Sequence, residues 1–392
     1  MPTFKADLAV IGAGAVGASC AYHAAKRGLK VALFDARMPT AGTSGACSGL
    51  IAISTKKPGL AADLAAETKR LYPKVVAELD SDVEYRPAPL LMLIEDADIL
   101  TELEIYQDTV RDHGWRLDHL DRAAVLALEP NLSPDFEGAL LCPDEATVNP
   151  YRMTLGMVAG AVARGATTHW GIKPRAIDVV GDSIAAIDTP AGRIEAEQYV
   201  FAAGVWSPDL GAMVGLDLPV IPRRGDVVVT ARAAPIVSHY LMAASSMVVK
   251  NRPELAETTD DPLMRRGGGF GTHVNALGQC LLGTTRAFAG HDRTTDPDGV
   301  RAIVASALKR LPGLARVPIL RTFVGLRPHV PDGKPIIGRS GRVSNLLVAT
   351  GHDGDGISLS VVTGDVIADM ATGRRPRIDV SALSPDRFPA LG

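Results

Sequence analysis

The stretch GAGAVG at residues 12–17 constrains the fold of this chain more than any other sequence feature. It follows the apolar run DLAVI at residues 7–11, and a second apolar run, KVALF at residues 30–34, leads into Asp35. Helical spacing connects the two runs over residues 15–27. A strand, a GxGxxG turn, a helix, a second strand and an acid in this order are typical of a βαβ unit that binds a dinucleotide. The sequence therefore predicts an α/β fold with a Rossmann-like domain.

The glycines and the acid of this unit each have a physical function. Gly12 permits the tight turn, Gly14 lets the backbone approach a pyrophosphate, and Gly17 lets the helix pack close to the strands. The helix N-terminus offers free N–H groups and the positive end of its dipole to the phosphates. Asp35 can accept hydrogen bonds from both ribose hydroxyls, and its charge disfavours the 2′-phosphate of NADP. The motif alone does not distinguish FAD from NAD.

Length and composition exclude several classes of protein. The chain has 392 residues, enough for about two domains, and its net charge of −3 gives no attraction to nucleic acid or to an anionic membrane. No uninterrupted apolar segment reaches the roughly 18 residues of a membrane-spanning helix. The cysteines form no zinc or iron–sulfur spacing, so we expect no metal site and reduced, buried thiols in a cytoplasmic protein. They are Cys20, Cys47, Cys142 and Cys280.

Two further segments of small residues follow apolar runs. Residues 41–53 read AGTSGACSGLIAI, and residues 202–207 read AAGVWS. Small side chains expose backbone N–H groups, which suits loops that lie against a cofactor. For residues 41–53, a plain connecting loop is the alternative.

The middle of the chain has the pattern of an antiparallel sheet. Alternating apolar residues predict strands at residues 219–230, 241–249 and 278–284. Residues 252–269 are charged and glycine-rich, so we expect a long surface loop there. Such a loop is either a lid or partner contact, or a tolerated insertion.

A second strand–turn–helix pattern stands at residues 349–358, which read ATGHDGDGIS. The apolar run 346–349 precedes the turn, and helical spacing follows over residues 357–370. Cofactor-type features therefore flank the strand-rich region, which predicts a discontinuous cofactor domain with a second domain inserted into it. We expect the side chains of Asp353 and Asp355 to cap the helix and to be solvated.

These motifs together resemble the FAD-dependent amine oxidoreductases of the D-amino-acid oxidase superfamily, in the branch with glycine oxidase and sarcosine oxidase. The resemblance covers nearly the whole chain and rests on GAGAVG with Asp35, TSGACSG from Thr43, AAGVWS from Ala202, GLRPHVPDGKPIIG from Gly325 and ATGHDGDGI from Ala349. The form GHDGDGI is most similar to the FAD subunits of heteromeric opine oxidases and hydrogen cyanide synthase.

The resemblance implies a division into two domains and a set of cofactor contacts. The FAD-binding domain would comprise residues 1–82, 140–218 and 322–392, and the antiparallel-sheet substrate domain residues 83–139 and 219–321. FAD, bound non-covalently, would contact Gly12, Gly14, Ala15, Val16, Gly17, Asp35, Ala36, Thr43, Ser44, Gly45, Ser48, Gly49, Leu50, Pro174, Ala202, Ala203, Gly204, Trp206, Gly325, Arg327, Gly351, Asp353, Gly354, Asp355, Gly356 and Ile357.

In this family the last glycine turn packs on the flavin, and the helix after it points its N-terminus at the N1–C2=O edge of the ring. Reduced flavin carries negative charge at that edge, and free N–H groups at residues 356–358 would stabilise it. Gly351, Gly354 and Gly356 would let the backbone approach the ring.

The resemblance also implies a substrate residue, Arg327. The arginine of the matching GLRP segment pairs with the substrate carboxylate in glycine oxidase-like enzymes, and a planar guanidinium suits that contact. The alternative for Arg327 is a structural salt bridge near the domain junction. His352 is a candidate catalytic residue, although His352 and His329 are better interpreted as structural or hydrogen-bonding residues than as proton carriers.

Two departures from the family pattern bear on the site. Glycine oxidase carries a second arginine where this chain has Gly354, which disfavours the smallest amino acids and opens space for a bulkier substrate. The sequence has no cysteine after Cys280, so the late cysteine that anchors flavin in monomeric sarcosine oxidase is absent.

The implied activity is oxidation of a C–N bond by hydride transfer to flavin N5, with imine hydrolysis to a 2-oxo acid and an amine. The substrate stays open among opines, proline, sarcosine and D-amino acids. The resemblance implies a catalytic subunit with partner subunits for electron transfer, which would hold FMN and an iron–sulfur cluster, and a cytoplasmic location with membrane association through that complex. The alternatives are a stand-alone oxygen-using oxidase, a non-catalytic FAD-bearing scaffold and an NAD-dependent dehydrogenase.

Overall fold

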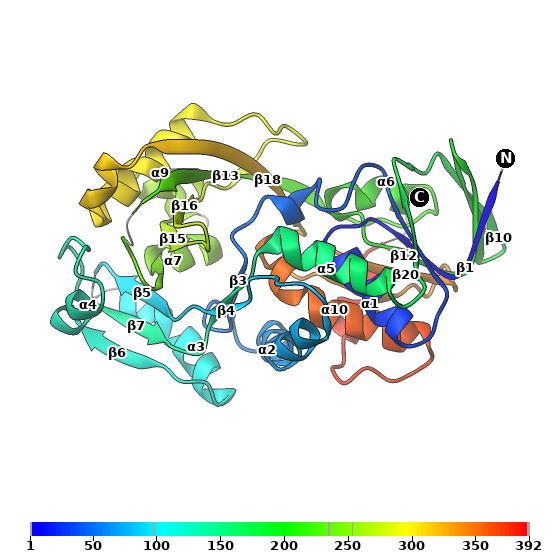
Figure 1. Cartoon of the computed structure of the whole chain (residues 1–392), viewed down its shortest axis with the longest axis horizontal. Helices are drawn as coiled ribbons and strands as arrows, with labels where there is room; N and C mark the ends of the chain where they lie inside the picture. Colours follow the sequence, from blue (N-terminus) through cyan, green and yellow to red (C-terminus); the bar gives the residue numbers. More distant parts are fainter. Residues whose placement is uncertain (1, 97–98, 234–235, 253, 390–392) are drawn as a thin grey trace.

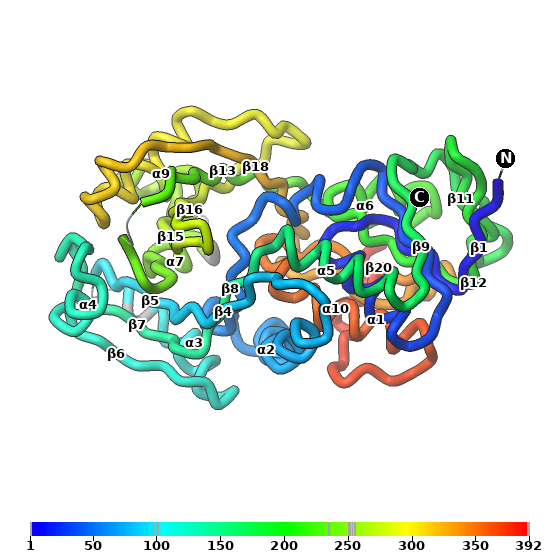
Figure 2. The backbone as a smooth tube through the Cα atoms, viewed as in Figure 1, coloured from blue at the N-terminus to red at the C-terminus, as the bar shows by residue number. Residues whose placement is uncertain are grey.

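The computed structural model describes residues 2–96, 99–233, 236–252 and 254–389. Two large sheets lie in the two halves of the molecule, and the halves meet at β3, β4 and the long strands β13 and β18 (Figure 1). Figure 2 shows that the chain passes repeatedly between the halves, so segments far apart in sequence make up each of them.

The first sheet has eight strands, in the order β10–β11–β12–β1–β2–β9, with β20 paired to β12 and β19 paired to β20. Its central neighbours β20, β12, β1, β2 and β9 are parallel. The strands are β1 Thr3–Ile11, β2 Val31–Asp35, β9 Thr167–Trp170, β10 Ala176–Val180, β11 Ser183–Thr189, β12 Gly192–Phe201, β19 Ile336–Arg339 and β20 Leu346–Thr350.

Both faces of the first sheet are covered, which explains why its strands read as continuous apolar runs. Leu8 and Val10 of β1 pack into the core beneath the helices, whereas Ala9 and Ile11 pack on the opposite face. The helices that cover the first face are α1 Ala15–Lys26, α2 Leu60–Glu78, α5 Pro150–Val162 and α10 Gly356–Ala371. The opposite face packs against α6 Ser207–Ala212 and the β10–β11 hairpin.

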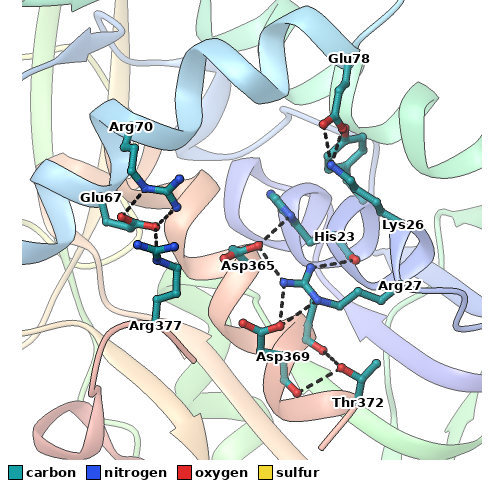
Figure 3. Close-up of polar contacts among 12 residues, drawn as sticks. His23, Lys26, Arg27, Glu67, Arg70, Glu78, Asp365, Asp369, Thr372 and Arg377 are labelled. Atoms are coloured by element: carbon teal, nitrogen blue, oxygen red, sulfur yellow. Dashed lines mark hydrogen bonds and ion pairs between the residues drawn. The ribbon is translucent and has the colours of Figure 1, made fainter. Parts of the chain in front are cut away.

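Charged side chains join three of these helices at the edge of their apolar contact (Figure 3). Arg27, the C-cap residue of α1, donates to Asp365 and Asp369 of α10, with Nη2–Oδ1 distances of 2.8 Å in both pairs. Lys26 of α1 pairs with Glu78 of α2 at 2.6 Å. These ion pairs fix the helices that present the first glycine turn and the last one.

The second sheet has nine strands, in the order β17–β13–β16–β15–β14–β5–β7–β6, with β18 paired to β13. All its pairs are antiparallel except β5 with β14. The strands are β5 Leu90–Ile94, β6 Asp118–Asp121, β7 Gly138–Cys142, β13 Ile221–Arg232, β14 Tyr240–Ala243, β15 Gly271–Val274, β16 Gln279–Gly283, β17 Ala287–Phe288 and β18 Ile319–His329.

Helices cover both faces of this sheet as well. Apolar residues of α4 and α9 pack on one face, and those of α3 pack on the other. The bounds are α3 Ile99–Asp112, α4 Arg122–Leu128, α7 Ser245–Asn251, α8 Leu255–Thr258 and α9 Pro297–Arg310. A small sheet of β3 Leu50–Ile51, β4 Arg86–Pro87 and β8 Ala146–Thr147 lies at the junction of the halves.

The predicted fold class, an α/β Rossmann-like domain interrupted by a largely antiparallel sheet, is confirmed. Two predicted boundaries need correction because they fall inside strands. The boundary before residue 140 cuts β7, and the boundary before residue 322 cuts β18, and both strands belong to the nine-stranded sheet. The other domain bounds stay a prediction. Within the described ranges, no helix is long and apolar enough to cross a membrane.

Two local predictions in the middle of the chain were wrong. The strand expected at residues 241–249 ends at Ala243, and α7 follows from Ser245 because apolar residues recur there at helical spacing. Residues 252–269, expected to form a surface loop, contain α8 and a 3₁₀ turn at Met264–Arg266. Leu263 of this segment is buried in the core of the second half, and its burial attaches the segment to that core although the neighbouring residues are charged. Residue 253 lies outside the described residues.

Candidate active site

A cavity of about 1020 Å³ extends from the first glycine turn to the inner face of the second sheet. Small-molecule sites typically measure roughly 300–1,000 Å³, so the cavity has room for a long ligand such as a dinucleotide. Every predicted cofactor residue except Gly17 and Gly45 lines it. The lining residues that the sequence predicted are Gly12, Gly14, Ala15, Val16, Asp35, Ala36, Thr43, Ser44, Ser48, Gly49, Leu50, Pro174, Ala202, Ala203, Gly204, Trp206, Gly325, Arg327, Gly351, His352, Asp353, Gly354, Asp355, Gly356 and Ile357.

The first glycine turn is packed too tightly for side chains. Gly12 has a φ of +113°, and a Cβ on it would lie 2.4 Å from the carbonyl oxygen of Ala202. A Cβ on Gly17 would lie 1.8 Å from the carbonyl oxygen of Gly12. Gly17 therefore serves the packing of α1 on β1, which is why it does not reach the cavity. Gly45 also serves close packing, since a Cβ built on it would lie 2.4 Å from the carbonyl oxygen of Thr40.

Polar contacts fix the groups around the N-terminus of α1. Oγ of Ser44 accepts a hydrogen bond from the N–H of Ala15 at 2.8 Å. Asp35 accepts from the N–H groups of Ala13 (2.8 Å) and Arg37 (2.7 Å), which fixes its carboxylate beside the turn. The first turn of α1 has no acidic residue, so nothing on this helix opposes an anion at its N-terminus. These residues fit the pyrophosphate and the ribose of a dinucleotide.

Both carboxylates of the last glycine turn line the cavity as members of ion pairs. Asp353 forms an ion pair with Arg223, and Asp355 forms one with Lys56. Asp355 stands at the N-cap position of α10, but neither aspartate side chain forms a capping hydrogen bond, so the expected side-chain capping role was wrong. The ion pairs neutralise both carboxylates and leave the first N–H groups of α10 free for a ligand atom, in agreement with the fit of a flavin there.

Arg327 lies on β18, opposite Arg223 of β13 in the strand register. Its Nη1 donates to the carbonyl oxygen of Thr285 at 3.2 Å, and its Nη2 donates to Oγ1 of Thr284 at 2.9 Å. Among the described residues, Arg327 forms no ion pair, so the alternative of a structural salt bridge has no support. Burial lowers the pKa of Arg327, an effect that the charge of Asp353 counteracts.

His352 is buried and turned toward α10. Its Nε2 lies 2.9 Å from Oγ1 of Thr363, and burial lowers the pKa of His352 to about 4. A neutral imidazole engaged with a helix hydroxyl suits a structural role and gives no support to proton transfer. Burial also lowers the pKa of His329, which packs beside the ring of Phe288.

Sequence reasoning missed several residues of the cavity. Arg223, Arg286, Lys56, Cys47 and Tyr240 all line it. Arg223 and Arg286 reach it through strand pairing across the second sheet, and no local motif marks them. Cys47 was named only as a buried thiol, and burial raises its pKa to about 12.

The chain is similar over nearly its whole length to known proteins and to a known family. The model of the family described as DAO, FAD dependent oxidoreductase, matches residues 7–370. Hydrogen cyanide synthase subunit HcnC of Pseudomonas protegens is 27% identical over 425 residues, which span 97% of this chain and 96% of that protein. Glycine oxidase of Geobacillus kaustophilus is 26% identical over 395 residues, with 98% of each chain covered. The crystal structure of glycine oxidase from Geobacillus kaustophilus matches with a TM-score of 0.87 at 24% identity, covering 99% of this chain and 100% of that one.

Proposed function

The chain belongs to the family of FAD dependent oxidoreductases, and we propose that its substrate is a secondary amine or an amino acid whose carboxylate binds Arg327. The family membership confirms the resemblance found in the sequence. It also confirms FAD as the cofactor and an oxidoreductase activity on amino or amine C–N donors. The identity of the amine, the acceptor of the electrons and the roles of individual residues are the subject of the proposal.

The observation that carries the proposal is the state of Arg327. Its guanidinium lies in the cavity, is oriented by Thr284 and Thr285, and has no carboxylate partner within the described part of the chain. Each terminal nitrogen keeps a second N–H, which is the arrangement that a bidentate carboxylate needs. A buried cation without an anion is costly, and an anionic substrate would remove that cost.

The reaction divides between cofactor and protein. When bound along the cavity, FAD would supply a two-electron acceptor for oxidation of the C–N bond to an imine, which water would hydrolyse to a 2-oxo acid and an amine. Arg327 binds and orients the carboxylate so that this carbon faces the ring. The carboxylates of Asp353 and Asp355 lie in the last glycine turn, and Arg223 and Lys56 neutralise them there, so that the N–H groups of the turn can favour an anionic ring edge.

We further propose that the chain is the catalytic subunit of a heteromeric dehydrogenase, with FMN and an iron–sulfur cluster on partner chains. The support is the similarity over 97% of the chain to a protein that is named as a subunit. Electrons would leave toward those partners, in the cytoplasm or at a membrane that the complex contacts.

The substrate proposal is tested by an anaerobic spectrum. The purified yellow holoenzyme is titrated with secondary amino acids, opines, proline and D-amino acids, and bleaching of the flavin bands is followed. Arg327→Met should raise the amine concentration for half-bleaching at least about 10-fold, and Arg327→Lys should raise it less, because a charged hydrogen bond contributes about 1.5–3 kcal/mol. Bleaching that is indifferent to Arg327→Met contradicts the assignment.

A matched control comes from the same strand. Arg321 also lies on β18, is exposed and stacks over Phe323, outside the cavity lining. Arg321→Met should leave the titration unchanged. The acceptor is tested by admitting air or a phenazine dye to the bleached enzyme: recolouring that is slow in air and fast with the dye supports a dehydrogenase, and rapid recolouring in air supports the oxidase alternative.

A further inference from the structure

Arg286 is a second guanidinium in the cavity, and like Arg327 it has no acidic partner among the described residues. It follows Thr284 and Thr285, the residues that hold Arg327, so the chain itself places the two arginines next to each other. Its Nη1 donates to the carbonyl oxygen of Gly267 at 2.5 Å. Within the described ranges, Nε and Nη2 of Arg286 donate to no group, and no carboxylate pairs with this side chain.

The charges around the two arginines do not balance. Arg223, Arg286 and Arg327 all line this part of the cavity, and in the described part of the chain only Arg223 has a paired carboxylate, that of Asp353. The nearby pair of Lys56 and Asp355 is neutral as a whole. Burial is the main cause that lowers the pKa of Arg286 to about 9; the charges of Arg327 and Arg223 add to this effect, and those of Asp353 and Asp355 counteract it. The carboxylates of Asp353, Asp355 and Asp226 offset part of this charge, but among the described residues neither Arg286 nor Arg327 has a carboxylate of its own.

A single carboxylate would balance only one of these charges. A guanidinium that is held by a backbone carbonyl, with its remaining N–H groups free, is suited to a second carboxylate. Gly354 makes space beside Arg327, because a Cβ there would already lie 3.7 Å from its Cδ. We propose that the substrate is a dicarboxylate, in which one carboxylate binds Arg327 and a second, on the other arm of the amine, binds Arg286.

This inference rests on the proposed function, since it names the substrate class of the same site. Its test therefore uses ligands that cannot react. Oxydiacetate has the shape of a secondary-amine diacid with an ether oxygen in place of the nitrogen, and its monoamide has the same shape with one negative charge fewer. Homologues with one or two additional methylene groups in the second arm allow for the unknown distance between the carboxylates. Binding is followed through the perturbation of the flavin spectrum.

In the wild-type holoenzyme, at least one diacid of the series should bind about 10- to 100-fold more tightly than its own monoamide, because a charged hydrogen-bond pair contributes that factor. Arg286→Gln should reduce this ratio to about 1–3. The matched control is Arg266→Gln. Arg266 directly precedes Gly267, whose carbonyl oxygen holds Arg286, but it pairs with Asp296 at 2.5 Å and is outside the cavity lining. Arg266→Gln should keep the wild-type ratio.

Two outcomes overturn the inference. One is a series in which no diacid binds better than its monoamide. The other is an Arg286→Gln variant that weakens diacid and monoamide equally, which would assign Arg286 to the cofactor or to the fold. Failure of the proposed function is distinct: the diacids would bind selectively, but no amine, including iminodiacetate, would bleach the flavin.

Discussion

Gly225 of β13 leaves the space that the guanidinium of Arg327 fills: a Cβ built on Gly225 would lie 2.2 Å from Nη1 of Arg327. Gly225 pairs with Gly325 in the register of β13 and β18, so the carboxylate-binding group depends on a bare position in the neighbouring strand. The length and the charge of Arg327 are therefore not sufficient to place its guanidinium in the cavity. The side chain also needs the space beside Gly225.

Gly225→Ala should therefore displace Arg327 while its charge is retained. Overpacking of this kind costs about 1–3 kcal/mol, so we expect the affinity for a carboxylate substrate to fall roughly 5- to 150-fold in the anaerobic titration. FAD content should not change. Gly313→Ala is the control, because a Cβ there meets nothing within 4 Å. A Gly225→Ala enzyme with wild-type affinity would show that Arg327 is not confined by β13.

FAD should leave the protein on denaturation, as expected for a non-covalent cofactor. Cys47 is the cavity-lining cysteine within the described residues, and burial raises its pKa to about 12, so it has almost no thiolate at neutral pH. Its Sγ lies 3.6 Å from the carbonyl oxygen of Ser44. After acid precipitation, the flavin fluorescence should be in the supernatant, for the wild type and for Cys47→Ser alike. Yellow colour that stays in the wild-type pellet and is lost from the Cys47→Ser pellet would indicate a covalent link.

The free energy of unfolding should decrease as the pH falls below about 6.5, because three histidines are buried in the neutral form. Burial lowers the pKa of His23, His273 and His352 to about 4. The unfolded chain binds these protons near pH 6.5 and the folded chain does not, so the stabilisation is complete above about pH 6.5 and is lost as the pH falls toward 4. Each histidine contributes a slope of at most about 1.4 kcal/mol per pH unit.

Urea unfolding of the holoenzyme between pH 4.5 and pH 7.5 measures this slope. His352→Gln should flatten it. His113 is the control, because its pKa is raised: burial lowers it, but the carbonyl of Thr109 and the carboxylate of Asp63 more than offset that effect. His113 thus stabilises the fold at low pH and loses this contribution as the pH rises, so His113→Gln should not flatten the acid-side loss. Equal slopes for wild type and His352→Gln would contradict the assignment.

Arg27→Met should destabilise the contact between α1 and α10. Arg27 is the shared partner of Asp365 and Asp369, and its loss leaves two neighbouring, largely buried carboxylates without a cation. Breaking such a pair costs up to about 3–5 kcal/mol when fully buried, and we expect about 2–3 here because Asp365 is partly exposed. Lys26→Met removes an exposed ion pair with Glu78 and should cost about 0–1 kcal/mol. Similar urea midpoints for the two variants would show that burial does not distinguish the pairs.

The parts of the site that are local in sequence were predictable, and the parts made by strand pairing were not. GAGAVG and ATGHDGDGI each form the turn between a strand and the helix that directly follows it in sequence, so their glycines could be assigned from spacing alone. Arg223 and Arg286 enter the cavity only through the pairing of β13 with β17 and β18. The partners of Asp353 and Asp355 lie on distant segments too, which is why a local capping role was the wrong prediction.

The same reasoning explains the errors in the fold. Residues 241–249 alternate well enough for a strand, but only the first part finds a partner, β5, and the rest forms α7. The boundaries at 140 and 322 were implied by the resemblance, whereas β7 and β18 continue through them because each pairs along its length with a neighbour in the second sheet.

The pairing of β12 with β20 has a consequence for the order of events during synthesis. Tyr199–Phe201 of β12 are hydrogen-bonded to residues 346–348, which leave the ribosome more than a hundred residues later. Until then this edge of β12 is open, and the face of α1 that α10 covers is exposed. The cofactor half therefore cannot be completed until nearly the whole chain has been synthesised, shortly after β18 Ile319–His329 has completed the second sheet. Loading of FAD is then expected to follow translation, and a chaperone that shields this edge would act on the cofactor half alone.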